Sequence, residues 1–145
     1  MLLILESPSI PAIYPAIKGG FAFALIDSKI HLVQFLALYY HSTTGNYHSY
    51  AKEPITDVDI ISNVSCKVYI NLQNNIFYST SEDEHELFLH LSSKQIIYYL
   101  GSQVSISVKS MNSMNMITLH STAFKIYKIL TDEKILLSIL HCLNI

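Results

Sequence analysis

Short runs in which apolar and polar residues alternate fill the middle of the chain, and such alternation is typical of half-buried β-strands. One clear run is 66–72, in which Val68, Ile70 and Leu72 alternate with more polar residues and are expected to face the core. Asn74-Asn75 follows with the residue types of a tight turn. We therefore predict an antiparallel hairpin here, with the second strand returning directly after the turn.

Two more hairpins are predicted from the same kind of pattern. Upstream, a turn at Ser28-Lys29 would join two apolar runs, residues 21–27 and 31–41, although the second run also keeps the 3.6-residue spacing of a helix. Downstream, Gly101-Ser102 separates two runs within residues 95–110, and in the second of these apolar residues alternate with serines. Both regions are therefore expected to form antiparallel strand pairs.

The last third of the chain changes to the period of a helix. Two apolar stripes at helical spacing are formed by Ala123, Ile126, Tyr127 and Leu130, and by Leu136, Ile139, Leu140 and Leu143. Thr131-Asp132 interrupts the pattern between them and can cap a second helix. We expect both stripes to pack on the core, and a helix face offered to a partner is the alternative.

The order of these elements predicts an α+β fold, in which a mainly antiparallel β-sheet packs against two C-terminal amphipathic helices. At 145 residues the chain has the length of one domain that can bury a core without help. Within that single domain, residues 1–145, we expect a proline-rich extended lead-in over 1–20, mainly strands over 21–110 and helices over 114–145.

Composition favours contact with a protein partner over contact with nucleic acid. Hydrophobic residues make up 50% of the chain and charged residues 14%, against roughly 25% in an ordinary soluble domain. Apolar surface left over from the core usually marks a partner. The formal net charge is −2, all nine cations are lysines, and arginine is absent. Because arginine binds phosphate and guanine in a bidentate way, its absence argues against phosphate chemistry and sequence-specific nucleic-acid binding.

The cysteine content and the apolar segments of the sequence predict an intracellular, cytoplasmic setting. Cys66 and Cys142 are too few for a disulfide framework, so a reduced protein is expected. Glu6 and several prolines interrupt the N-terminal apolar run, which does not match a signal peptide. The longest apolar stretch, residues 21–40, contains Asp27 and other polar residues, so no transmembrane segment is predicted.

The stretch DEHELFLHLS, residues 83–92, comes close to the HExxH signature of zinc peptidases. In that signature two histidines four apart lie on one helix face, whereas His85 and His90 are five apart and diverge on a helix or on a strand. The peptidase interpretation is therefore rejected. We expect a helix that begins with the capping box Ser81–Glu84 and pairs Glu86 with His90 on its surface, with a strand over the leucines as the alternative.

Other pairs of potential ligands are incomplete. His41 and His48 flank a turn and would face each other across a hairpin, but two ligands do not complete a zinc site. Asp57 and Asp59 place two carboxylates on one face of an extended segment, which is the minimum for a divalent ion. No catalytic residue, metal site or cofactor is assigned, and a metal-dependent hydrolase remains an alternative function.

Two short resemblances to known families follow from these residues. The opening LLILESPS, with Glu6 after an apolar strand, resembles the first strand of the Toprim domain of type IA topoisomerases and primases, and Asp57 and Asp59 are similar to that family's later Asp-x-Asp. The resemblance implies metal-dependent handling of nucleic acid. The glycines and basic residues of the family pattern are missing here, so no residue role is taken from it.

The second resemblance is to the coronavirus replicase protein that binds single-stranded RNA through a small β-barrel. KGGFAFALID (residues 18–27), Glu53-Pro54 and KVY (residues 67–69) resemble that family in order and rough spacing. The resemblance implies a small barrel with an RNA-binding surface. The family's glycine-rich C-terminal dimer helix and its basic residues are missing, so no residue is carried over.

The function favoured by these observations is that of a non-enzymatic interaction or accessory protein, for example a small subunit of a larger assembly or a viral accessory factor. It would act as a homo-oligomer or on a protein partner. A single-stranded nucleic-acid-binding small β-barrel is the other alternative function. Candidate contact residues are tyrosines and helix positions of the kind found at interfaces: Tyr39, Tyr40, Tyr98, Tyr99, Ile126, Tyr127, Leu136 and Leu140.

Overall fold

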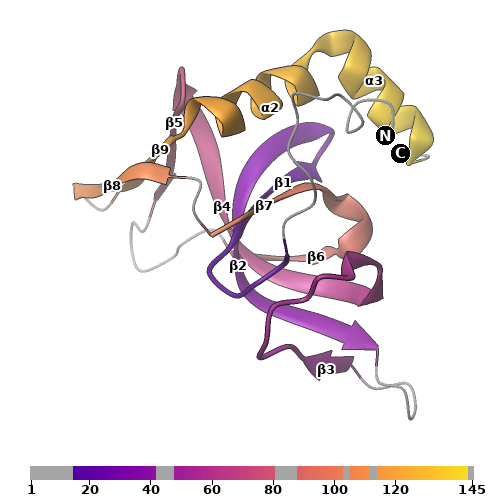
Figure 1. Cartoon of the computed structure of the whole chain (residues 1–145). Coiled ribbons are helices and arrows are strands. Elements are labelled where there is room, and N and C mark those ends of the chain that lie inside the picture. Colours follow the sequence, from indigo (N-terminus) through magenta and orange to yellow (C-terminus); the bar gives the residue numbers. More distant parts are fainter. Residues whose placement is uncertain (1–14, 42–47, 81–87, 103–104, 112–113, 144–145) are drawn as a thin grey trace.

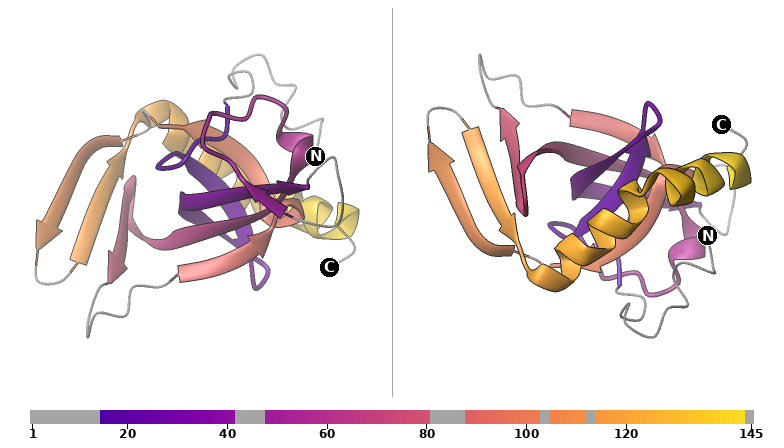
Figure 2. Two further views of the ribbon diagram at one scale, coloured as in Figure 1. Left: turned by 90° about the horizontal axis from the view of Figure 1, so that it is seen from below. Right: turned by 90° about the horizontal axis from the view of Figure 1, so that it is seen from above.

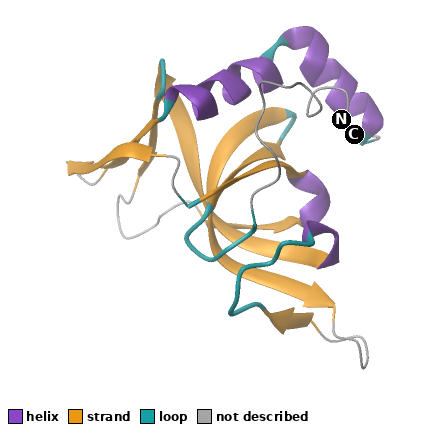
Figure 3. Cartoon of the chain, in the orientation of Figure 1, coloured by secondary structure: helices purple, strands orange, loops and turns teal. Residues whose placement is uncertain are grey.

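The structure of the chain is a computed structural model that describes residues 15–41, 48–80, 88–102, 105–111 and 114–143 (Figure 1). The strands of this described part are β1 (Phe21–Ile26), β2 (Lys29–His41), β3 (His48–Tyr50), β4 (Ile61–Gln73), β5 (Ile76–Thr80), β6 (Phe88–Ser92), β7 (Ile96–Gly101), β8 (Ser105–Met111) and β9 (Met114–Leu119). Its helices are α2 (Ser121–Thr131) and α3 (Glu133–Cys142), with short 3-10 turns η1 (Val58–Ile60) and η3 (Ser93–Gln95). The paired strands are antiparallel, and the predicted α+β fold with two C-terminal helices is confirmed (Figure 3).

Strands β1, β2, β4, β6 and β7 form one strongly curled sheet, which we call the barrel. Its order is β7-β1-β2-β4, and β6 pairs with β4 on the side away from β2. Because only η3 separates β6 from β7 along the chain, the two ends of this row are held together (Figure 2). A capping box between Ser92 and Gln95 shapes η3, and Gln95 Nε2 also donates to the carbonyl oxygen of Leu25 on β1 at 3.2 Å.

Strand β1 is buried on both faces because the barrel interior covers one side and the helices cover the other. Its bulky residues Phe21, Phe23 and Leu25 belong to the cluster beneath the helices, whereas Ala22 and Ala24 belong to the cluster inside the barrel. Strands approach one another closely inside a tightly curled sheet, so small side chains suit the inner positions. The alternation of large and small residues over 21–25 therefore favours a strand, and it places the small side chains on the inner side of the curled sheet.

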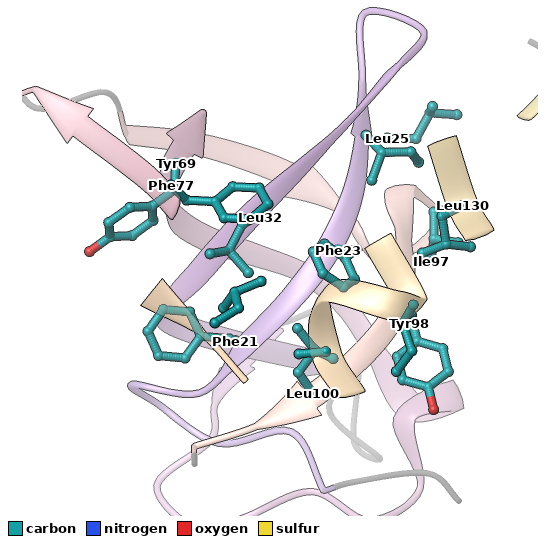
Figure 4. Packing of buried hydrophobic residues seen from close by; sticks show 14 of the residues in the cluster. Phe21, Phe23, Leu25, Leu32, Tyr69, Phe77, Ile97, Tyr98, Leu100 and Leu130 are labelled. Carbon is teal, nitrogen blue, oxygen red and sulfur yellow. The ribbon is translucent and has the colours of Figure 1, made fainter. Parts of the chain in front are cut away.

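Two apolar clusters hold the fold together. The inner cluster fills the barrel and consists of Ala16, Ala22, Ala24, Val33, Phe35, Leu38, Ala51, Ile55, Ile61, Val64, Cys66, Val68, Leu91 and Ile96. The outer cluster lies between the sheet and the helices, and Figure 4 shows part of it, including Phe21, Phe23, Leu32, Phe77, Leu100 and Leu130. Each face of the curled sheet thus has its own core.

The two predicted helical stripes are confirmed. Ala123, Ile126 and Leu130 of α2 and Ile139 of α3 are fully buried in the outer cluster, with the remaining stripe residues partly buried against it. Asp132 separates the helices as predicted. Its Oδ1 accepts hydrogen bonds from the backbone N–H groups of Lys134 at 3.1 Å and Ile135 at 3.4 Å, which satisfies donors at the start of α3.

Beyond the barrel, the end of β4 continues into a second group of strands. Residues 70–73 of β4 pair with β5, β5 pairs with β9, and β9 pairs with β8. We call these four paired segments the wing, and both Figure 1 and Figure 2 show that it projects away from the barrel. The wing begins with the predicted hairpin at Asn74-Asn75, where Asn74 has a positive φ of 48°.

The other two hairpin predictions have different outcomes. The upstream hairpin exists, but its turn is Asp27-Ser28, one residue earlier than predicted, with the two positive φ values that a tight I′ turn needs. The alternative of a helix over residues 31–41 is wrong. The downstream hairpin at Gly101-Ser102 is also wrong, because β7 pairs with β1 whereas β8 pairs with β9. Gly101 has a φ of 78° at the end of β7 and lets the chain turn away from the barrel.

Three further expectations need correction. Ile70 and Leu72 are exposed rather than core-facing, because β4 leaves the barrel after Val68 and its inner side is no longer covered there. Residues 88–92 form β6, so the predicted helix is wrong over them, and Ser81–Glu84 and Glu86 lie outside the described residues. Strands continue to Leu119, and the helical part begins at Ser121 rather than at residue 114.

Candidate functional site

The barrel interior is packed with side chains and offers no reactive group to solvent. Phe35 and Val64 are at most 1% exposed, and the thiol of Cys66 lies among them. Burial raises the pKa of that thiol to about 12, so it stays protonated and unreactive at neutral pH. Within the described ranges, no group of three or more histidines, cysteines or acidic residues could hold a metal ion. The search for a site therefore moves to the outside of the molecule.

The first outside feature is an apolar face of the wing. Ile70, Tyr78 and Met116 are register partners on β4, β5 and β9, so their side chains form a row on one face. Ile76 lies on the same face because side chains alternate along a strand. The exposed Leu72 lies beside this row, at the register shift between Asn71 and Gln73 of β4. Ile70 is 40% exposed and Leu72 is 49% exposed. We call these five residues the wing face.

The opposite face of the wing is covered, which explains why the wing face is not. Phe77 and Ile117 are register partners whose side chains point the other way, and both are buried in the outer cluster. The ring of Phe77 meets Tyr127 of α2 with a centroid distance of 4.9 Å. The helices therefore cover one side of the wing, and the five apolar side chains lie on the side away from them.

The second outside feature is an open hollow of about 650 Å³ beside β3. We call it the loop hollow, and it is lined by Tyr40, Tyr50, Ala51, Lys52, Glu53, Pro54, Ile55, Thr56, Asp57 and Ile60. Tyr50 is 40% exposed and Ile60 is 47% exposed. Tyr50 also meets Tyr39 edge to face, with ring centroids 6.0 Å apart. Aromatic and aliphatic surface thus dominates it, with charged residues of both signs around it.

The third outside feature is a polar pair on the barrel. Ser65 of β4 and His90 of β6 are register partners, and Ser65 Oγ lies 2.7 Å from His90 Nδ1. Two positions along, Phe88 of β6 lies opposite Lys67 of β4, and its ring is 50% exposed. A Ser–His pair is a possible nucleophile and base. In the described part of the chain, however, no carboxylate hydrogen-bonded to His90 is recorded, so the geometry is that of a cross-strand hydrogen bond.

The two pairs considered earlier as metal ligands have different outcomes. Asp57 is not in an extended segment; it caps the 3-10 turn η1, and its Oδ1 accepts from the backbone N–H of Asp59 at 3.2 Å. That hydrogen bond gives Asp57 a local structural role. His41 and His48 are register partners on β2 and β3, as the sequence suggested, while the turn between them lies outside the described residues.

The eight predicted contact residues separate into two groups. Tyr98 and Ile126 are buried in the outer cluster, and Tyr127, Leu136 and Leu140 pack partly against it, so these five mainly serve the protein's own core. Burial also raises the pKa of Tyr127. The buried Tyr98 and Ile126 therefore offer little surface to a partner, whereas the other three side chains remain partly exposed.

The remaining three predicted contact residues belong to the barrel. Tyr39 and Tyr40 are half-buried on β2, and Tyr40 lines the loop hollow. Tyr99 packs on Phe35, with ring centroids 5.8 Å apart. Burial, with a smaller contribution from the negative charge of Asp59, raises the pKa of Tyr99 to about 12. Of the eight, only Tyr39 and Tyr40 lie next to an outside feature.

Comparison with family models, with curated protein sequences and with solved structures finds no match to this chain. Among the described residues, no helix is long and apolar enough to cross a membrane.

Sequence reasoning missed the wing face because alternation does not show where a strand leaves its cover. Ile70 and Leu72 continue the pattern of Val68 without a break, so they look like core. One signal was present in their surroundings. Asn71 lies between Ile70 and Leu72, and the polar residues Gln73, Asn74 and Asn75 follow them. Such a polar run is typical of the exposed end of a hairpin.

Proposed function

We propose that this chain is a non-enzymatic interaction protein that binds another protein chain through the wing face. The observation that supports this most directly is the exposure of Ile70, at 40%, in the apolar row that it forms with Tyr78 and Met116, together with that of Leu72, at 49%, beside the row. Transfer of apolar surface out of water contributes roughly 25 cal/mol per Å². An exposed apolar patch on a folded protein usually marks a site of contact with another molecule.

The covered side of the wing explains why an apolar face is stable in this position. Phe77 and Ile117 anchor the wing to the helices from its other side, so the wing face needs no contribution to folding from Ile70 or Leu72. Their side chains are therefore available to a partner without loss of the core. A β-sheet face of this kind fits a flat or helical apolar surface on a partner. The partner can be another protein or a second copy of this chain.

The test is a charge placed in the wing face. In Leu72→Asp the fold is expected to persist, because Leu72 is half exposed near a hairpin end, while contact with an apolar partner is lost. The matched control is Leu137→Asp, which introduces the same change on α3 at a residue that is 60% exposed. Proteins that co-purify from the native source, and the sedimentation coefficient across a concentration series, are compared for the three forms.

The expected result is that the wild type and Leu137→Asp retain the same partner or the same self-association, and that Leu72→Asp loses it. If all three forms sediment alike at every concentration and co-purify with the same proteins, the wing face is not a contact site and the proposal fails.

A specific observation favours one other candidate function, the binding of single-stranded nucleic acid. Phe88 presents a half-exposed ring on the outer face of the barrel. Its register partner Lys67 is only 9% exposed and holds its Nζ 5.5 Å from the centroid of the Tyr69 ring. An exposed aromatic ring can serve as a stacking platform for a base. The curled sheet is also the type of architecture that the resemblance to the coronavirus RNA-binding protein implies.

That candidate is tested by the anisotropy of labelled oligouridylate and oligothymidylate at low ionic strength. Binding that weakens with salt, is lost in Phe88→Ala and is kept in Leu137→Ala would establish it. An unchanged anisotropy up to high protein concentration would dispose of it, and would leave the wing-face proposal untouched.

A further inference from the structure

We propose that the loop hollow is the docking site of the protein's own proline-rich N-terminal segment, residues 8–14. This inference concerns a different surface from the wing face and does not depend on it. It follows from the lining of the hollow, from the point at which the described chain begins, and from the composition of the segment itself.

The lining of the hollow has the chemistry of a groove for extended proline-rich chains. Tyr40, Tyr50, Pro54 and Ile60 offer aromatic and aliphatic surface, and the hollow is open along one side. Grooves lined with aromatic side chains bind proline-rich segments in the polyproline II conformation, because the pre-formed helix loses little entropy on binding. Tyr39 supports the ring of Tyr50 edge to face at 6.0 Å, which holds that ring in place.

The described chain begins at the edge of this hollow. Ala16 and Ile55 form an antiparallel bridge in which Ala16 N donates to Ile55 O at 2.8 Å and Ile55 N donates to Ala16 O at 2.7 Å. Ile55 is one of the residues that line the hollow. In an antiparallel arrangement, the residues before Ala16 run alongside those that follow Ile55. The described chain therefore begins next to Ile55, at the edge of the lining, and the proposed occupant joins it at this point.

The segment that precedes this anchor has the composition such a groove requires. Pro8-Ser9-Ile10-Pro11 is a PxxP sequence, and Pro15 directly follows the segment. Proline lacks a backbone N–H and fixes φ, so these residues favour an extended polyproline II chain over a further strand of the sheet. At about 3.1 Å per residue, the seven residues 8–14 span roughly 22 Å. Because the tether is short, the effective concentration of the segment at the hollow is of the order of millimolar, so a weak site is enough.

The experiment places a nitroxide spin label next to the PxxP sequence in the full-length chain. Ser7→Cys is introduced together with Cys142→Ser, which removes the exposed native thiol, while Cys66 is fully buried and does not react. Amide resonances of the ¹⁵N-labelled protein are then compared before and after reduction of the label. Docking predicts selective broadening at Tyr50, Lys52 and Ile60. Broadening confined to other parts of the surface, such as α3, or no selective broadening at all, overturns the proposal.

Two controls identify the occupant. Tyr50→Ala removes a half-exposed ring outside both clusters, and Pro8→Ala with Pro11→Ala removes the PxxP prolines; each change is expected to reduce the broadening by several-fold while the other resonances stay in place. A mixture of spin-labelled unenriched protein with unlabelled ¹⁵N protein tests for exchange between copies. Broadening that appears equally in that mixture assigns the segment to the hollow of a second copy and overturns docking within one chain.

Discussion

The rings of Phe77 and Tyr127 meet edge to face, with centroids 4.9 Å apart and planes at 87°. Phe77 lies on β5 and Tyr127 on α2, so this contact joins the wing to the first helix. Phe23 of β1 touches the same tyrosine ring at a centroid distance of 5.5 Å. Tyr127 is therefore the point at which the barrel, the wing and the helices meet.

The first prediction concerns this contact. Phe77→Ala should lower the free energy of unfolding by about 3–5 kcal/mol, because it leaves a cavity in a fully buried site. A double-mutant cycle with Tyr127→Leu should give a coupling of about 0.5–1.5 kcal/mol between the two rings. Urea titration followed by circular dichroism measures both values. Phe88→Ala is the matched control and should change stability by less than about 0.5 kcal/mol, because its ring lies half in solvent.

The second prediction concerns the boundary between the helices. Asp132 Oδ1 accepts two backbone hydrogen bonds at the start of α3, so Asp132→Ala should cost about 1 kcal/mol of stability. Asp132→Asn keeps an oxygen acceptor at the same place and should retain most of that stability. Equal losses in the two variants in urea titration would show that the carboxylate charge, rather than the cap, is what matters.

Local signals predicted the parts of this fold that depend on neighbouring residues. The two helical stripes, the cap at Asp132 and the turn at Asn74-Asn75 each depend on a few adjacent side chains, and the structure has all of them. The same holds for the hairpin that follows residue 26, whose turn differs from the prediction by one position. Such features are set by short-range sterics and hydrogen bonds.

The parts that could not be predicted depend on distant strands. Gly101-Ser102 looks like a hairpin turn, but Phe21 and its neighbours in β1 offer β7 an apolar partner far away in the sequence. Phe88–Ser92 follows a stretch with helix-start signals and still forms a strand, because β4 supplies a free edge for it. Pairing and burial of this kind outweigh local propensity, and one sequence does not reveal them.

The candidate site shows the same division. Tyr40 was identified from its residue type alone, and it lines the loop hollow. The wing face was not identified, because the exposure of Ile70 depends on where β4 separates from the barrel. No local pattern marks that point.

The third prediction concerns the two thiols. Cys142 is exposed on α3, whereas Cys66 is buried and burial raises its pKa to about 12. In the native protein at mildly alkaline pH, a disulfide reagent should therefore modify one thiol per chain quickly, and the second only after unfolding in urea. Cys142→Ser should abolish the fast phase. A fast phase that persists in this variant would mean that the barrel opens readily around Cys66.

The fourth prediction concerns pH and His31 of β2. Burial, and secondarily the positive charge of Lys29, lower the pKa of His31 below its ordinary value, while Asp27 opposes the shift weakly. In the unfolded chain the same imidazole titrates near pH 6.5, at about its ordinary pKa. Between that value and the lower pKa of the folded state, the unfolded chain binds more protons, so the free energy of unfolding falls as the pH falls through this window.

His31→Gln removes this proton uptake but keeps a polar side chain of similar reach. The difference in unfolding free energy between the wild type and His31→Gln should therefore be constant above about pH 7 and should shift in favour of the variant as the pH falls below about 6.5. Urea titrations of both proteins at a series of pH values measure it, and the six other histidines, common to both, cancel in the comparison to the extent that they are independent of His31. A difference that stays constant across the series, or that shifts toward the wild type in acid, would show that the imidazolium is not disfavoured in the folded barrel.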